Sequence, residues 1–230
     1  MKLLALDTAT EACSAALWLD GEIISRYALA PREHAHRIIP MMDELLEEAG
    51  IALRQLDAIA FGRGPGSFTG VRIAASVTQG AAFGAGLPVI PVSTLAALAQ
   101  AAIEEQGAER ILPAIDARMQ EVYWAEYRRD EHGLAELVDE ELVIPPDQVP
   151  VPEASGYTGI GSGWQTYAEE LGQRLEGRIA RTLPDALPQA RHVARLAAAY
   201  HERGVSLAAH QALPVYLRDQ VAKKPSRKPL

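Results

Sequence analysis

The sequence FGRGPGSFTGVR, residues 61–72, places four glycines and a proline between two segments of different character. The apolar run LDAIAFG (56–62) precedes it and predicts a buried strand. The segment GVRIAASVTQGAAFGAG (70–86) follows it and predicts a helix of small residues, which Ser67 or Thr69 is suited to cap. The stretch therefore predicts a strand, a tight loop and a helix.

Two phosphate-binding motifs share this order of elements, but for each of them this sequence lacks a residue on which phosphate binding depends. A G-x-x-x-x-G-K-[ST] loop needs a lysine after Gly66, where Ser67 and then Phe68 stand. A G-x-G-x-x-G fingerprint begins well with Gly62 and Gly64 but meets Ser67 at its third glycine. We predict a turn that shapes the entry of the helix, with an anion at the free N–H groups of the helix as the alternative.

Two neighbouring helices are predicted to offer more apolar or small-residue surface than their own sheet covers. Glycine inside a helix costs about 1 kcal/mol relative to alanine, so Gly80 and Gly84 predict a closely packed partner helix. The preceding helix (32–50) carries an apolar arc wider than a one-sided surface helix needs. The residues predicted to bind another protein are Ile39, Met42, Leu46, Gly70, Ile73, Ala74, Val77 and Ala81. The alternative is a domain that buries both helices by itself.

The same order of predicted elements occurs twice along the chain, which predicts a duplicated α/β fold. Residues 2–29 read as a strand ending at Asp7, a polar turn, a second strand, a turn and a third strand. The segment from 110 repeats this order, with Asp116 in the place of Asp7, the strand EVYWAEY (121–127) and a charged turn before a third strand. In such duplicated folds the two aspartates face a cleft between the halves.

The two aspartates are therefore candidates to hold Mg²⁺ or to orient a water molecule, and the alternative is a capping aspartate in a turn. No glycine follows Asp7 or Asp116, although a phosphate-binding hairpin needs one for the close approach of its N–H groups. His34 and His36 lie two residues apart and point to different sides of a helix, so no metal site is predicted. We predict no catalytic residue and no cofactor. The alternative function is an ATP-dependent phosphotransferase or ATPase.

The composition limits the partners of the chain. A net charge of −8 over 230 residues makes it a poor lone binder of nucleic acid. The single cysteine, Cys13, lies in an apolar run and is predicted to be buried. No stretch approaches about 18 uncharged apolar residues, so a cytosolic protein without a membrane span is expected.

The motifs LALDTATEACSAAL, HRIIPMMDELLEEAG, GPGSFTGVRI and DARMQEVY, in this order, resemble the bacterial TsaB (YeaZ) family over residues 3–218. The resemblance implies two ribonuclease-H-like domains of the actin, Hsp70 and sugar-kinase superfamily. It implies an N-terminal domain (1–106, completed by a segment near 204–218) and a C-terminal domain (107–203). The basic tail (219–230) falls outside the resemblance and is predicted to be disordered.

The same resemblance implies a function through partners. TsaB-like proteins are non-catalytic subunits that pair with the TsaD transferase, with the TsaE ATPase as a further subunit. The complex forms N6-threonylcarbamoyladenosine at position 37 of tRNAs that read codons beginning with A. Pairing uses the helices of the N-terminal domain, through which TsaB-like proteins also form homodimers, and tRNA is reached only through the complex.

Overall fold

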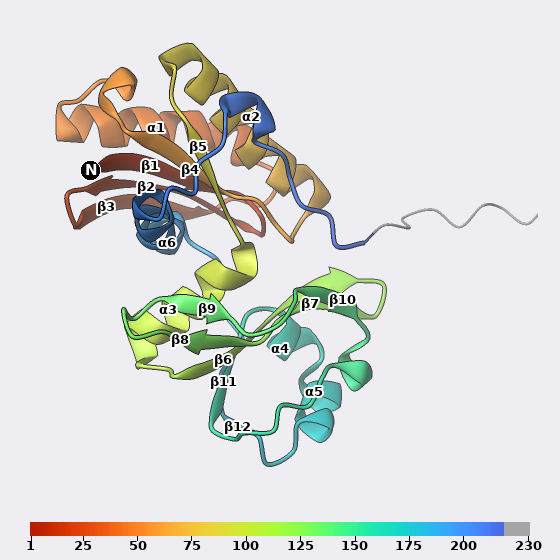
Figure 1. Cartoon of the computed structure of the whole chain (residues 1–230). Coiled ribbons are helices and arrows are strands. Elements are labelled where there is room, and N and C mark those ends of the chain that lie inside the picture. The colour runs from red at the N-terminus through yellow and green to blue at the C-terminus, as the bar shows by residue number, and fades with distance from the viewer. Residues whose placement is uncertain (219–230) are drawn as a thin grey trace, which may run out of the picture.

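The first half of the chain forms a five-stranded sheet in the order β3-β2-β1-β4-β5 (Figure 1). The first three strands are antiparallel, whereas β4 and β5 run parallel to β1. The strands are β1 (Lys2–Asp7), β2 (Ala12–Leu19), β3 (Glu22–Leu29), β4 (Ala58–Gly62) and β5 (Val89–Val92). The helices of this half of the sequence are α1 (His34–Ala49), α2 (Phe68–Ala85) and α3 (Thr94–Gln106). The structure is a computed structural model and describes residues 1–218, so the tail prediction lies outside the described residues.

The second half repeats the strand order as β10-β7-β6-β11-β12, with the same antiparallel and parallel pairings. The strands are β6 (Arg110–Arg118), β7 (Glu121–Trp124), β10 (Leu142–Ile144), β11 (Tyr157–Ile160) and β12 (Ile179–Leu183). The helices are α4 (Gly163–Thr166), α5 (Ala168–Arg174) and α6 (Ala190–Glu202). Two sheets with this shared order make the fold a duplicated, ribonuclease-H-like α/β fold.

The prediction of one strand over EVYWAEY is wrong in detail. The strand breaks after Trp124, and Tyr127 begins β8 (Tyr127–Arg129), which pairs with β9 (Ala135–Leu137) in an extra hairpin. The two parts pair with different ends of the nine-residue strand β6: β7 with its C-terminal part and β8 with its N-terminal part. The third strand of the repeat is therefore β10.

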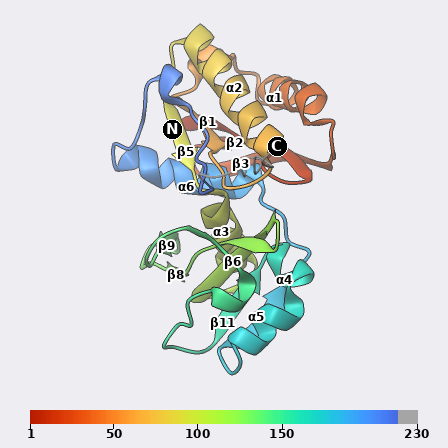
Figure 2. The same cartoon turned by 90° about the vertical axis from the view of Figure 1, so that its right-hand side faces the viewer.

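The layers follow from the two-residue period of the strands. In β1, Leu4 and Leu6 pack against α1, while Leu3 and Ala5 face the opposite side and join a core shared by both halves. This shared core contains α3 and α6, which lie between the two sheets (Figures 1 and 2). The order of layers is α1 and α2, first sheet, α6, α3, second sheet, α4 and α5.

The two helices between the sheets are exchanged relative to the predicted domain limits. Helix α6 packs on β1, β2, β4 and β5 of the first sheet, although the prediction assigns residues 107–203 to the second domain. Helix α3 packs on β6, β8, β9 and β11 of the second sheet, although the prediction assigns 1–106 to the first. We therefore propose to count α6 with the first domain and α3 with the second.

The helix ends agree with the residues that mark them. Ser67 caps α2 through a hydrogen bond from the Gly70 N–H (3.4 Å), and Gly50 ends α1 in the left-handed conformation (φ 64°). Cys13 is fully buried in the core beneath α1, as predicted. Within residues 1–218, no helix combines the length and the apolar character that a membrane span requires.

Candidate functional site

The glycine-rich loop between β4 and α2 lies directly on the turn that follows β1. The Ser67 N–H donates to the Ala9 carbonyl (2.7 Å), and the Thr8 hydroxyl donates to the Gly70 carbonyl (2.7 Å). A Cβ atom added at Gly70 would lie 2.0 Å from the Thr8 carbonyl oxygen, a distance that no real Cβ contact reaches. Glycine is needed here because two backbones touch.

The same close approach recurs along the loop. A Cβ atom at Gly62 would lie 2.0 Å from Asp7 Oδ2, and one at Gly66 would lie 2.4 Å from the Ala9 carbonyl oxygen. Three glycines spaced four residues apart thus leave room for the turn after β1. The loop shapes the start of α2, as predicted, and its glycines face the chain itself.

This loop seals Asp7. The carboxyl is fully buried, its Oδ1 accepts the Ala9 N–H (3.0 Å), and its Oδ2 has no hydrogen-bond partner among residues 1–218. Burial raises the pKa of Asp7 to about 6, against the lowering effect of the Ala9 hydrogen bond. Asp7 therefore does not face the cleft, contrary to the expectation from the duplicated fold.

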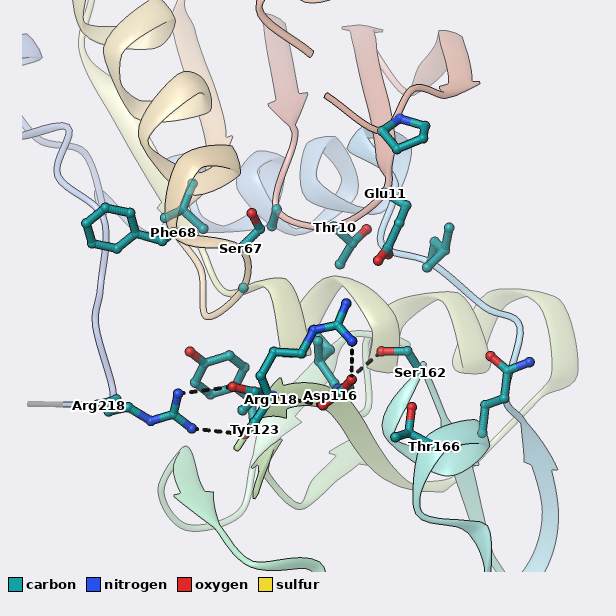
Figure 3. A pocket seen from close by; sticks show the side chains of 18 of the residues that line it. Thr10, Glu11, Ser67, Phe68, Asp116, Arg118, Tyr123, Ser162, Thr166 and Arg218 are labelled. Carbon is teal, nitrogen blue, oxygen red and sulfur yellow. Dashed lines mark hydrogen bonds and ion pairs between the residues drawn. The ribbon is translucent and has the colours of Figure 1, made fainter. Parts of the chain in front are cut away.

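Asp116 does face the cleft between the halves, a cavity of about 870 Å³ (Figure 3). Its Oδ1 accepts the Arg118 N–H (2.8 Å) and the Tyr167 hydroxyl (3.2 Å), and its Oδ2 pairs with the Arg118 guanidinium (3.0 Å). Its own N–H donates to the Ser162 hydroxyl (3.1 Å). The carboxylate is well partnered, and it is separated from the sealed Asp7.

The turn beyond Asp116 has an unusual backbone. Arg118, Met119 and Gln120 all adopt positive φ angles (61°, 57° and 62°), which residues other than glycine rarely adopt. Arg218 holds this turn by donating to the Ala117 carbonyl (3.1 Å) and the Arg118 carbonyl (3.3 Å) and by pairing with Glu121. Figure 3 shows Arg218 next to Arg118.

The structure thus does not bring the two predicted aspartates into one site. A phosphotransferase of this fold would need both carboxylates to be accessible from the cleft, and only Asp116 is. In the part of the chain that the structure describes, no group of three or more histidine, cysteine, aspartate or glutamate side chains could hold a metal ion.

The outer helices carry the second candidate site, on the face of the first sheet turned away from the cleft (Figure 2). A largely apolar groove of about 320 Å³ runs along the start of α2, next to α1. It is lined by Ala35, Phe68, Thr69, Arg72, Ile73, Ser76 and Val77. Further along α2, a Cβ atom at Gly80 or at Gly84 would meet nothing within 4 Å among the described residues.

The eight residues predicted to bind a partner divide into two groups. Met42, Gly70 and Ala74 are buried within the chain, because Met42 and Ala74 belong to its cores and Gly70 rests on Thr8. These three are not available to a partner, so the prediction is wrong for them. Because Ala74 is buried, the substitution Ala74→Arg would also disturb the fold. The residues that remain at the surface are Ile39, at 48% exposure, and the half-buried Leu46, Ile73, Val77 and Ala81.

Sequence reasoning missed an aromatic cluster at the start of α2. Phe68 is 63% exposed, the Arg72 guanidinium lies 3.1 Å from the centre of its ring, and Tyr216 lies 6.1 Å away, centre to centre. The spacing of Phe68 and Arg72, one helical turn apart, was a readable signal for their contact. The contact with Tyr216 joins residues far apart in the sequence and carries no such signal.

The strand order and the interdomain cleft define the class of protein: a two-domain α/β protein with ribonuclease-H-like halves. Comparison with known proteins narrows the class. A family model described as "TsaD: tRNA N6-adenosine threonylcarbamoyltransferase" matches residues 23–226. The tRNA threonylcarbamoyladenosine biosynthesis protein TsaB of Escherichia coli is 47% identical, over 97% of this chain and 97% of its own length.

Further relatives agree. TsaB of Haemophilus influenzae is 42% identical over 97% of this chain and 96% of its own. The solved structure of YeaZ from Pseudomonas aeruginosa is similar, with 51% identity, a TM-score of 0.88 and coverage of 94% of this chain and 99% of that chain. The chain belongs to the TsaB (YeaZ) family of tRNA threonylcarbamoyladenosine biosynthesis proteins.

Proposed function

We propose that this chain is a non-catalytic accessory subunit that binds and activates a TsaD-like transferase. The reaction supported is the formation of N6-threonylcarbamoyladenosine at position 37 of tRNAs that read codons beginning with A. A TsaE-like ATPase is the further partner, and tRNA is reached through the complex. The chain itself contributes a docking surface.

The observation that carries this proposal is the open glycine stripe on α2. Gly80 and Gly84 lie inside a helix, where each costs about 1 kcal/mol relative to alanine. Within the described chain nothing packs against either position, so neither glycine has a packing role there. A partner helix lying close against α2 would supply such a role, since the distance between packed helices depends on the side chains at the contact and glycine permits the closest approach.

The surroundings of the stripe support the same interpretation. The apolar groove beside Ile73 and Val77 continues the stripe toward the start of α2, and Ile39 extends it onto α1. An exposed apolar surface of this kind marks a protein interaction site. The sealed carboxyl of Asp7, in contrast, offers little support for the alternative of a phosphotransferase.

Activation requires more than attachment. A bound subunit shifts an enzyme toward a competent state only if it binds that state more tightly than the others. We infer that α1 and α2 make these differential contacts.

The test replaces Gly80 by leucine and measures the affinity for the cognate TsaD transferase by titration calorimetry. The new side chain occupies the space that a close partner helix would need, so the affinity is expected to fall by about tenfold or more. The isolated variant is expected to be as stable as the parent or more so, because leucine favours a helix over glycine.

Gly172→Leu is the matched control. Gly172 also lies inside a helix, α5, with nothing within 4 Å of an added Cβ, but in the second half of the chain. This variant is expected to bind the transferase as the parent does. Unchanged binding by Gly80→Leu would exclude the stripe as the docking surface. Light scattering on the isolated chain shows whether the stripe also mediates self-pairing, which Gly80→Leu would then abolish.

A further inference from the structure

A single buried carboxylate joins the two halves of the chain at the glycine-rich loop. Glu141 lies just before β10, and its side chain is only 6% exposed. Its Oε2 accepts from the Arg63 guanidinium (2.9 Å), and its Oε1 accepts from the Tyr127 hydroxyl (3.0 Å) and the Ser93 hydroxyl. Two of these donors, Arg63 and Ser93, belong to the first half of the sequence.

The partners of Glu141 are suited to an ionised carboxylate. Burial, together with the charge of Glu141, raises the pKa of Tyr127 well above its usual value, so Tyr127 keeps its proton and donates it. A buried charge is tolerated when every lone pair is hydrogen-bonded, and the loss of one partner is then strongly destabilising. The positions of the Arg63 and Tyr127 side chains are therefore coupled through their shared hydrogen bonds to Glu141.

Ser93 is saturated by the same arrangement. Its hydroxyl oxygen accepts from the Leu95 N–H (3.1 Å) and the Ala96 N–H (3.3 Å), which caps α3. A hydroxyl can donate only one hydrogen bond, and Ser93 donates it to Glu141. The carboxylate also lies near the positive end of the α3 dipole.

The backbone around Arg63 passes this constraint on to α2. The Arg63 N–H donates to the Val92 carbonyl (2.8 Å), and the Arg63 carbonyl accepts the Val215 N–H (2.8 Å). The next residue, Gly64, accepts the Thr94 N–H (3.0 Å). A displaced Arg63 would therefore move the loop that leads into α2, whose first residue, Phe68, lies five positions later.

We propose that Glu141 is a positioning residue: through Arg63, the second half of the chain fixes the loop 62–67 and hence the start of α2. Glu141 does not itself contact a docked protein in this proposal; its effect is on the geometry of the first turn of α2. The positioning concerns the isolated chain, while its consequence for docking rests on the proposed function.

The experiment compares amide hydrogen exchange of the isolated full chain and its Glu141→Gln variant. Glutamine keeps the shape of the side chain but removes the charge that pairs with Arg63. Exchange over residues 64–72 is expected to accelerate by about tenfold or more, the factor that corresponds to losing a hydrogen bond between charged groups. Exchange in β2 and β3, which lie far from Glu141, serves as the internal reference.

Glu104→Gln is the matched control. Glu104 also joins the halves, by accepting from His192 Nδ1 on α6 (3.0 Å), but it does not touch the loop 62–67. It is expected to lower overall stability without a selective effect on residues 64–72. If Glu141→Gln leaves 64–72 unchanged, or accelerates all regions alike as Glu104→Gln does, the proposal is overturned.

A double-mutant cycle adds a test of the mechanism. Arg63→Met alone leaves the Glu141 carboxylate without its cation and is expected to accelerate the same amides. Combined with Glu141→Gln, it removes both charges, and exchange over 64–72 is expected to be slower than in either single variant. Additive effects would contradict coupling through the ion pair. Arg63→Lys, which keeps the charge but loses the planar fork, replaces Glu141→Gln if that variant does not fold.

Discussion

Two turns occupy equivalent places in the two halves of the chain and have opposite environments. Each lies at the C-terminal end of the central strand of its sheet and begins with an aspartate: Asp7, the last residue of β1, and Asp116, two residues before the end of β6. The first aspartate is buried, with one oxygen that has no hydrogen-bond partner among residues 1–218, and the second faces the cleft with several partners.

The difference comes from where the neighbouring loop touches the strand. In the first half, Gly62 meets Asp7 itself and Gly70 meets Thr8, so the loop covers the aspartate and the residue beyond it. In the second half, Gly161 and Gly163 meet Ala114, two residues before the aspartate. The same device, a glycine loop against a strand end, thus closes one turn and leaves the other open. A duplicated fold can therefore keep its shape while only one half keeps an accessible carboxylate.

The largest effect expected is from breaking the close contact in the first half. Gly70→Ala would place a Cβ atom 2.0 Å from the Thr8 carbonyl, and we expect a loss of about 3 kcal/mol or more in the free energy of unfolding. Gly163→Ala meets the Ala114 Cβ at 2.8 Å and is expected to cost about 1 kcal/mol. Urea denaturation followed by circular dichroism measures both. Equal losses in the free energy of unfolding would mean that the two loops pack equally tightly against their strands.

The next effect concerns the buried carboxyl. The pKa of Asp7 in the fold is about 6, above its ordinary value of 3.8, so the folded state holds the proton more tightly than the unfolded state. The resulting stability is fully present below about pH 4 and is lost as the pH rises through about 6. Asp7→Asn cannot ionise, so at pH 7.5 it is expected to be more stable than the parent by on the order of 3 kcal/mol, at about 1.4 kcal/mol per pKa unit.

Unfolding free energies from pH 4 to pH 8 check this expectation. The parent should lose stability between about pH 4 and pH 6 relative to Asp7→Asn, and the two curves should run parallel above that range. Parallel curves over the whole range would show that Asp7 ionises as freely in the fold as in the unfolded chain.

The smallest effect is expected in the open turn. Asp116→Asn removes the charge that pairs with Arg118, whose side chain is 77% exposed, while the amide oxygen still accepts the Arg118 N–H. An ion pair with so exposed a partner contributes little, so the cost is expected to stay below about 1 kcal/mol and to shrink in high salt. A cost comparable with that of Gly70→Ala would remove the contrast between the turns.

Several elements could be predicted from the sequence because their signals are local. The repeated order of strands, the strand ending at Asp7 and the Ser67 cap depend on neighbouring residues alone. The candidate docking surface was predicted in part, since the helical period places Ile73 and Val77 on the outer side of α2. It failed for Met42 and Ala74, because an apolar arc does not say how much of it its own domain covers.

Local pattern therefore determined most of the elements, their order and the family of this protein. Only the tertiary structure decided which sheet each inner helix joins and which aspartate is accessible. Helix α3 shows why: residues 94–103 are all buried, so no polar face indicates a direction. The sealing of Asp7 likewise depends on a backbone contact between residues more than 50 positions apart, which no periodicity in the sequence records.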